Sequence, residues 1–139
     1  MNRRAVLLLH LLVAVLTLSG IGFAWMKYGM TTDDPFAAAN HPWQPTLLAV
    51  HVVAAAPATF ALGWLFSSHV WPKFRSPTRG RRTTGVAMMV VGAPMVLSAY
   101  LLQTATSEGF RLASAATHWA TSALFAAGYL GHLLTRRPR

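Results

Sequence analysis

Long apolar segments alternate with short polar ones along this chain. Four runs of about 20 residues carry almost no charge, and about 20 apolar residues is what an α-helix needs to cross the hydrocarbon core of a membrane. Strands of a membrane barrel would alternate polar and apolar side chains, which these runs do not do. The pattern therefore predicts an all-α protein, an integral membrane four-helix bundle that forms a single transmembrane domain over residues 1–139. The helices are expected at about 5–26, 46–71, 84–102 and 112–134.

The first apolar segment follows Arg3 and Arg4, as the core of a secretory leader would. The apolar region of a leader usually spans about 7–15 residues and ends at small residues. This segment is longer, and it contains His10. We therefore expect a retained transmembrane helix rather than a cleaved leader.

The composition agrees with a membrane protein and excludes several cofactors. Apolar residues make up 54% of the chain, charged residues only 11%, and the mean hydropathy is +0.42. The charged share is less than half that of a typical soluble domain. The chain has no cysteine, which excludes disulfides, iron–sulfur clusters and the C-x-x-C-H attachment of c-type haem. It also has no P-loop, no G-x-G-x-x-G motif and no evident internal repeat.

The net charge of +9 is distributed unevenly among the expected loops. Ten of the twelve basic residues precede the first helix, lie between the second and third, or follow the fourth. The opposite side has only Lys27 and Arg111, together with all three acidic residues. Because Lys and Arg gather on the cytoplasmic side of membrane proteins, both termini are expected in the cytoplasm. The charge thus reports orientation and contact with membrane lipid, and it requires no nucleic acid.

Five of the six histidines fall within the predicted helices. Ionisable side chains inside a membrane are costly and usually functional. His51 and His118 lie near the outer ends of two helices that run in the same direction. His10, His69 and His132 lie near inner ends. The histidines therefore define an outer and an inner level.

The histidines on one helix also share a face. His118 and His132 are 14 residues apart, which brings them to nearly the same side of a helix at an axial distance of about 21 Å. His51 and His69 are 18 residues apart, or five whole turns and about 27 Å, with an expected kink at Pro57 between them. Two levels of imidazoles inside a small helical bundle favour haem b with one histidine on each face.

Two axial imidazoles occupy both open positions on the iron, which favours electron transfer over oxygen chemistry. The second nitrogen of each ring is expected to bond a backbone carbonyl one turn earlier or a hydroxyl such as that of Ser114. Zinc or copper transport is less favoured, because the helices offer no Cys, Asp or Glu as further ligands. The alternative is a cofactor-free structural or assembly subunit of a larger membrane complex, whose histidines only join helices.

The layout resembles the di-haem cytochrome b membrane subunits of the formate dehydrogenase gamma type and related small bacterial b-type cytochromes. One histidine begins the first helix, one lies near the outer end of the second, and two lie on the fourth. By that resemblance His51 and His118 hold the iron of the outer haem b, and His10 and His132 hold the iron of the inner one. The family carries electrons between quinone near the inner haem and an outer-face redox protein, such as a c-type cytochrome or a dehydrogenase subunit. The resemblance implies an electron-transfer subunit of a membrane oxidoreductase complex rather than a stand-alone enzyme.

His69 departs from that pattern. It could replace His10 as the partner of His132, or serve a haem propionate or a bound quinone, and the resemblance favours His10 as the ligand. One or two haems per chain are therefore expected.

Other polar residues have two interpretations. Tyr100 and Gln103 could bond near the outer haem, although a place in the interfacial aromatic belt is the usual one. The arginines of the loop between the second and third helices could contact either haem propionates or lipid headgroups, and lipid headgroups are the usual partner. These arginines are Arg75, Arg79, Arg81 and Arg82.

Overall fold

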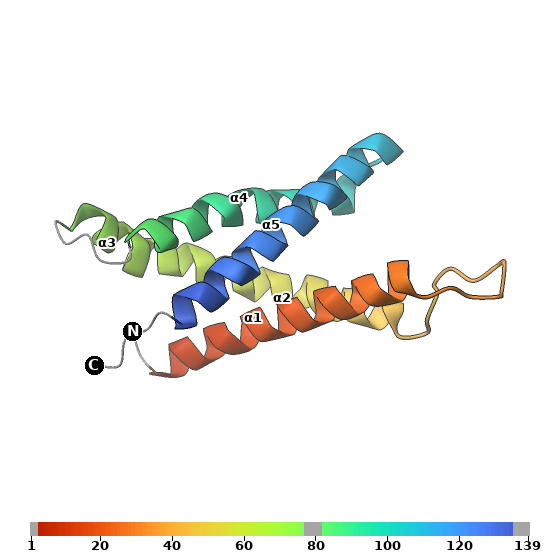
Figure 1. Ribbon diagram of the computed structural model, residues 1–139, viewed down its shortest axis with the longest axis horizontal. Coiled ribbons are helices and arrows are strands. Elements are labelled where there is room, and N and C mark those ends of the chain that lie inside the picture. The colour runs from red at the N-terminus through yellow and green to blue at the C-terminus, as the bar shows by residue number, and fades with distance from the viewer. Residues whose placement is uncertain (1–2, 77–81, 135–139) are drawn as a thin grey trace. The chain divides into compact units, whose positions relative to one another are not determined.

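A computed structural model of the chain describes residues 3–76 and 82–134 (Figure 1). Every regular element in those two ranges is helical, and they contain no strand. The predicted all-α class is therefore confirmed.

The helical runs cover the four predicted segments and extend beyond them. α1 (Arg3–Ala24) continues into the π-helical turn η1 (Trp25–Gly29), and α2 (Gln44–Leu65) continues into η2 (Phe66–Val70) and α3 (Trp71–Arg75). α4 (Arg82–Thr104) and α5 (Glu108–Leu134) follow. Pro57 lies inside α2 and Pro94 inside α4, and neither ends its helix.

Three of the described helical runs are long and apolar enough to cross a membrane. They are Arg3–Gly29, Gln44–Arg75 and Gly85–Thr104. α5 is 27 residues long but is not among them, because serine, threonine, glycine and two histidines lower its mean hydropathy. The length and apolar composition expected of membrane-crossing helices are thus confirmed for three of the described helices, and the fourth crossing stays a prediction.

The helices pack in two units, Met1–Trp64 and Leu65–Arg139. In the first unit a Cβ added at Gly22 of α1 would lie 2.9 Å from Leu47 Cδ1 of α2. Further along α2, the ring of His51 contacts Gly20 and the carbonyl of Leu16. Because the contacts move backwards along α1 as they move forwards along α2, the two helices are antiparallel neighbours.

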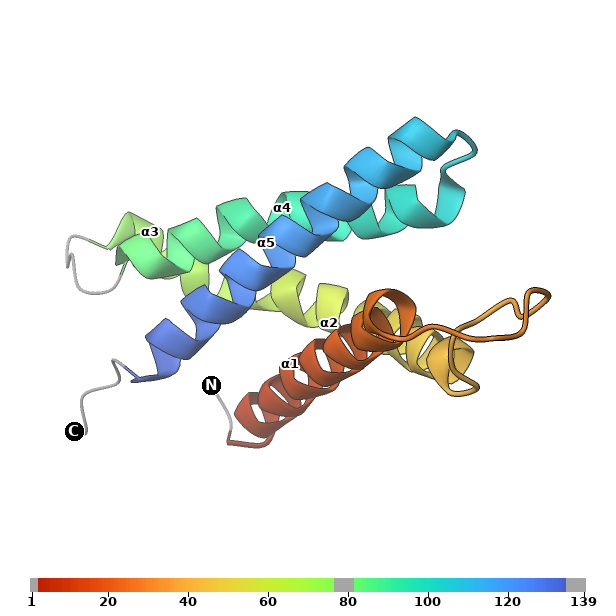
Figure 2. The same ribbon diagram turned by 45° about the vertical axis from the view of Figure 1, so that its right-hand side comes forward.

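The second unit is built around a hairpin of α4 and α5, which adjoin each other in both views (Figure 2). His118 contacts the carbonyl of Met95, and one turn earlier on α4 Gly92 faces Phe125. Small residues at such crossings let the helix backbones approach closely. Close packing of this kind stabilises helix pairs in a membrane, where the hydrophobic effect does not drive their association.

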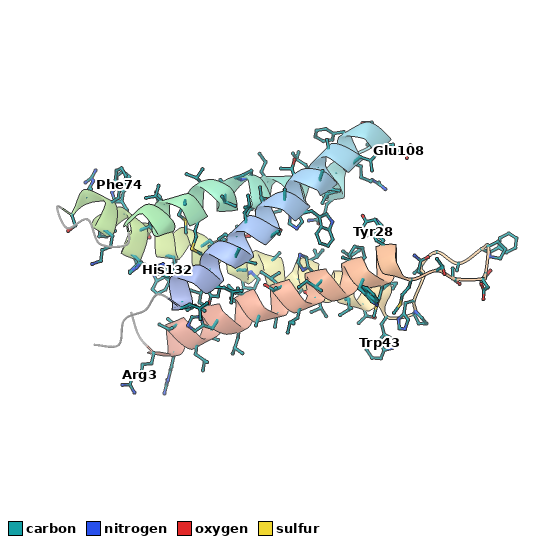
Figure 3. The ribbon with its side chains drawn as sticks, in the orientation of Figure 1. Arg3, Tyr28, Trp43, Phe74, Glu108 and His132 are labelled. Atoms are coloured by element: carbon teal, nitrogen blue, oxygen red, sulfur yellow. The ribbon has the colours of Figure 1, made fainter. Side chains whose placement is uncertain are left out.

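Side-chain hydrogen bonds tie the loop before α2 to both flanking helices. The Asn40 amide Nδ2 donates to the carbonyl of Lys27 in η1 at 2.9 Å, and the Asn40 backbone N–H donates to Gln44 Oε1 at 3.1 Å. Figure 3 shows Tyr28 and Trp43 at the loop end of the first unit and Arg3 at the other end. Asn40 therefore links the end of η1 to the start of α2.

Candidate functional site

The His51 ring is fixed by two oxygens of the neighbouring helix. Its Nδ1 lies 3.1 Å from the carbonyl oxygen of Leu16 and 3.1 Å from the hydroxyl oxygen of Ser19, both on α1. A carbonyl oxygen only accepts hydrogen bonds, so the proton of the neutral imidazole is assigned to Nδ1. The lone pair is then on Nε2, one of the two atoms through which neutral histidine binds metals.

The hydroxyl hydrogen of Ser19 is directed at a carbonyl of its own helix and not at His51. Its Oγ lies 2.6 Å from the carbonyl of Val15 and 3.3 Å from that of Leu16, and the residue is buried, with only 4% of its surface exposed. Because the single hydroxyl hydrogen goes to Val15, the oxygen accepts from His51 Nδ1–H. The imidazole proton is therefore shared between the Leu16 carbonyl and the Ser19 hydroxyl.

Gly20 makes room for this ring. A Cβ at this position would lie 3.1 Å from His51 Cε1 and 3.3 Å from Nδ1, closer than side chains normally approach. The imidazole consequently lies directly against the backbone of α1, and even alanine at position 20 would push it away.

His118 has the same kind of partner in the second unit. Its Nδ1 lies 3.0 Å from the carbonyl oxygen of Met95 on α4, which assigns the proton to Nδ1 here as well. The Ser98 hydroxyl donates to that same carbonyl at 3.0 Å, and Ser98 is buried, with 3% of its surface exposed. Both outer-level histidines therefore share one tautomer.

The two sites repeat one local arrangement. In each, the accepting carbonyl belongs to the residue three positions before a buried serine, Leu16 before Ser19 and Met95 before Ser98. Ser19 follows Arg3 by 16 residues, and Ser98 follows Arg82 by 16 residues, which corresponds to about 24 Å of α-helix. The two imidazoles thus lie equally far from the basic end of their neighbouring helix.

The loop histidine His41 has the opposite tautomer. His41 Nδ1 accepts a hydrogen bond from the backbone N–H of Trp43 at 3.1 Å, so the proton of the neutral ring belongs to Nε2. The Nδ1–H tautomer shared by His51 and His118 therefore follows from their helix contacts and is not common to all histidines of the chain.

The inner-level candidates lie on three different elements. His10 is a half-buried residue of α1, and the half-buried His132 lies at the end of α5 opposite Glu108 (Figure 3). His69 is exposed on η2. Because a π-helical turn takes more residues than an α-helical one, the 18-residue spacing no longer places His69 on the face of His51. The pairing of His132 with His10 or with His69 stays a prediction.

The partners of the rings differ from those expected. The bonded carbonyls come from the preceding helix rather than from one turn earlier, and the hydroxyl beside His51 is that of Ser19 rather than Ser114. Sequence analysis missed Ser19 and Ser98, although related segments, LTLSG and MVLSA, surround them. A serine in an otherwise apolar stretch was the available signal, but the partner helix could not be deduced from it.

The remaining polar candidates have contacts of their own. The Gln103 side chain donates to the carbonyl of Ala99 at 3.4 Å, and Tyr100 is 56% exposed on the same helix. The Arg75 guanidinium lies 4.7 Å above the Trp71 ring. Arg79 and Arg81 lie outside the described residues. Within residues 3–76 and 82–134, no three His, Cys, Asp or Glu side chains gather closely enough to hold a metal ion.

No protein-family model, curated protein or solved structure matches this chain. Over residues 3–76 and 82–134, the fold defines an all-α protein in which three helices are long and apolar enough to cross a membrane.

Proposed function

We propose that the protein is a b-type cytochrome subunit of a bacterial inner-membrane complex. It would form a four-helix bundle with both termini in the cytoplasm and carry electrons between quinone or quinol and an outer-face redox protein. The observation that supports this most is the matched state of His51 and His118. Each ring holds its proton on Nδ1 against a backbone carbonyl of the neighbouring helix.

This tautomer is the one that prepares an imidazole for an axial position. A metal-bound histidine usually donates its other ring N–H to a carbonyl or carboxylate, which fixes the ring and raises the basicity of the coordinating nitrogen. The carbonyls of Leu16 and Met95 perform this role here. Nε2 of each histidine is thereby the nitrogen that carries the lone pair.

The repeated spacing favours this function over the cofactor-free alternative. A histidine that only joins two helices can do so at any level of the membrane. Two ligands of one haem iron would have to lie at the same level, and the equal 16-residue spacings from Arg3 to Ser19 and from Arg82 to Ser98 support this proposal. The absence of a side chain at Gly20, which lets the His51 ring lie against α1, is also consistent with a function that depends on the position of this ring.

Haem b, when bound, supplies a reversible one-electron couple of its iron. His51 and His118 would hold the outer haem, and His10 and His132 the inner one. Ser19 would share the His51 proton and so adjust the electron density of that ligand. With both axial positions taken by imidazole, the chain would pass electrons on, and any substrate chemistry would belong to its partners.

The test is the haem content of the purified protein, from its reduced-minus-oxidised visible spectrum and its pyridine haemochrome. We expect a b-type spectrum, and the loss of one haem in both His51→Ala and His118→Ala. His41→Ala is the matched control, because its ring has the opposite tautomer in a loop, and it should retain all haem. A colourless wild-type protein with full helical content would instead support the cofactor-free subunit.

A further inference from the structure

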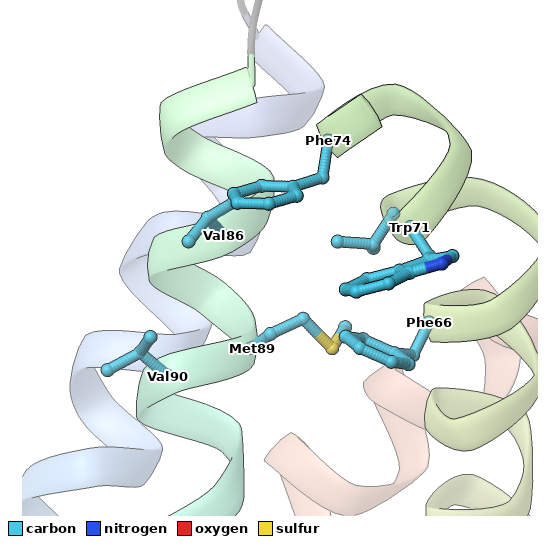
Figure 4. A pocket seen from close by; sticks show the side chains of 7 residues that line it. Phe66, Trp71, Phe74, Val86, Met89 and Val90 are labelled. Carbon is cyan, nitrogen blue, oxygen red and sulfur yellow. The ribbon is translucent and has the colours of Figure 1, made fainter. Parts of the chain in front are cut away.

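An apolar pocket opens in the second unit, between the η2–α3 segment and α4 (Figure 4). It encloses about 270 Å³. Phe66, Trp71 and Phe74 form one wall, and Val86, Met89 and Val90 of α4 form the other. None of these side chains is used by the histidine sites.

The aromatic wall is a continuous stack. The Trp71 ring lies 5.9 Å from the Phe66 ring and 6.0 Å from the Phe74 ring, and the Trp71 and Phe74 planes differ by only 13°. Among the lining side chains only the indole of Trp71 can donate a hydrogen bond. A quinone headgroup needs polar partners for its two carbonyls, whereas a hydrocarbon chain needs none, so the lining favours a hydrocarbon chain.

Positive charge lies beside this wall. The last turn of α3 carries Lys73 and Arg75, and the Arg75 guanidinium lies 4.7 Å above the Trp71 ring. Stacking on the indole orients the flat guanidinium, and its N–H groups match the oxygens of a phosphate. The pocket therefore combines an apolar interior with a cationic edge.

The length of the helix places that edge at the level of lipid headgroups. The run from Gln44 to Arg75 has 32 residues, or about 48 Å of helix, whereas the hydrocarbon core is about 30 Å thick. The run is therefore longer than the core, and because charged side chains are costly inside it, Lys73 and Arg75 are expected in the part that extends into the headgroup layer. Trp71, two residues before Lys73, then has the position typical of an interfacial tryptophan. Lys73 and Arg75 then lie at phosphate depth, with Phe66 at the depth of acyl chains.

We propose that this pocket is a binding site for one anionic phospholipid. One acyl chain lies between the aromatic wall and α4, and the lipid phosphate is bound by Arg75 and Lys73. Basic pockets between membrane helices on the cytoplasmic side recognise anionic headgroups in this way. The proposal is independent of whether the histidines bind haem.

The experiment uses the full-length protein in phosphatidylcholine nanodiscs that contain a rising fraction of phosphatidylglycerol with brominated acyl chains. Bromine quenches tryptophan fluorescence on contact, and Trp71 is one of five tryptophans. We expect quenching that saturates at a low fraction of the brominated lipid, and we expect Trp71→Phe to remove that saturating part. The double variant Lys73→Gln/Arg75→Gln should raise the fraction needed for half-quenching about tenfold.

Arg111→Gln is the matched control, since it removes a positive charge at the start of α5, on no wall of the pocket. It should leave half-quenching unchanged. Equal quenching by brominated phosphatidylcholine would show ordinary surrounding lipid and overturn the proposal. So would saturating quenching that survives in Trp71→Phe, or a native mass spectrum in which the protein retains a quinone and no phospholipid.

Discussion

The Nδ1 atom of His118 lies 3.0 Å from the carbonyl oxygen of Met95, on the helix that precedes it in the chain. His51 makes the corresponding contact with Leu16 at 3.1 Å. Each ring therefore takes its orientation from the hairpin to which it belongs. The proposed ligands are prepared separately, within each hairpin, and a shared haem would join two hairpins whose histidines already have the required tautomer.

Ser19→Ala tests the second acceptor of His51. The Leu16 carbonyl still holds the ring, so the haem should be retained, but His51 becomes a weaker electron donor. The midpoint potential of the outer haem should then rise by about 20 to 60 mV, as expected for one hydrogen bond. A redox titration monitored in the visible region measures this shift.

Ser98→Ala is the matched comparison for that variant. The Ser98 hydroxyl shares the Met95 carbonyl with His118 but does not contact the ring in the way that Ser19 does. Without the Ser98 hydroxyl, the Met95 carbonyl accepts a hydrogen bond only from the His118 imidazole. The midpoint potential of the outer haem should therefore fall slightly or stay constant. A rise as large as that of Ser19→Ala would show that the shift has another cause.

Gly20→Ala tests the close approach of the His51 ring. The added Cβ would lie 3.1 Å from Cε1, so the ring must shift by a few tenths of an ångström away from α1, which weakens its hydrogen bond to Leu16. We expect loss of the outer haem while helical content, measured by circular dichroism, is unchanged. Gly63→Ala on α2 is the control, because a Cβ there meets nothing within 4 Å. Full haem content in Gly20→Ala would contradict the assignment of His51 as a ligand.

His10→Ala and His69→Ala distinguish the two candidates for the inner level. His10 matches the resemblance, whereas His69 is exposed on a π-helical turn. Loss of one haem of two is expected in His10→Ala, and His69→Ala should keep both. Pyridine haemochrome analysis gives the count, and the reverse result would assign the inner haem to His69.

The predicted crossing of α5 can be tested with single cysteines, because the chain has none of its own. Asp34→Cys and Ser107→Cys should react with a membrane-impermeant maleimide from the outside of intact cells. Arg139→Cys should react only after the membrane is opened. Labelling of Arg139→Cys in intact cells would show that α5 does not cross or that the topology is inverted.

The sequence predicted the helices well because their signal is local. Runs such as Thr84–Leu102 are apolar over the length of a membrane crossing, and α4 covers that run. The π-helical turns at Trp25–Gly29 and Phe66–Val70 were not predicted, and the second one removes the simple spacing argument for His69. The i→i+5 backbone hydrogen bonds of a π-helical turn have no clear signature in the amino-acid composition.

The histidines were found because an ionisable residue in an apolar helix is conspicuous, but their partners were not. The acceptors of the two rings are the backbone carbonyls of Leu16 and Met95, and any residue type offers a carbonyl. Which one lies opposite a given ring depends on the register of two packed helices. Ser19 and Ser98 mark the positions, yet nothing in LTLSG or MVLSA reveals the register.

The central claim is that His51 and His118 bind the same iron. The most direct measurement is the electron paramagnetic resonance spectrum of the oxidised protein, which separates the low-spin signal of each bis-imidazole haem. The account predicts that His51→Ala and His118→Ala each lose the same low-spin signal and leave the other intact. Loss of different signals in the two variants, or of none, would contradict it.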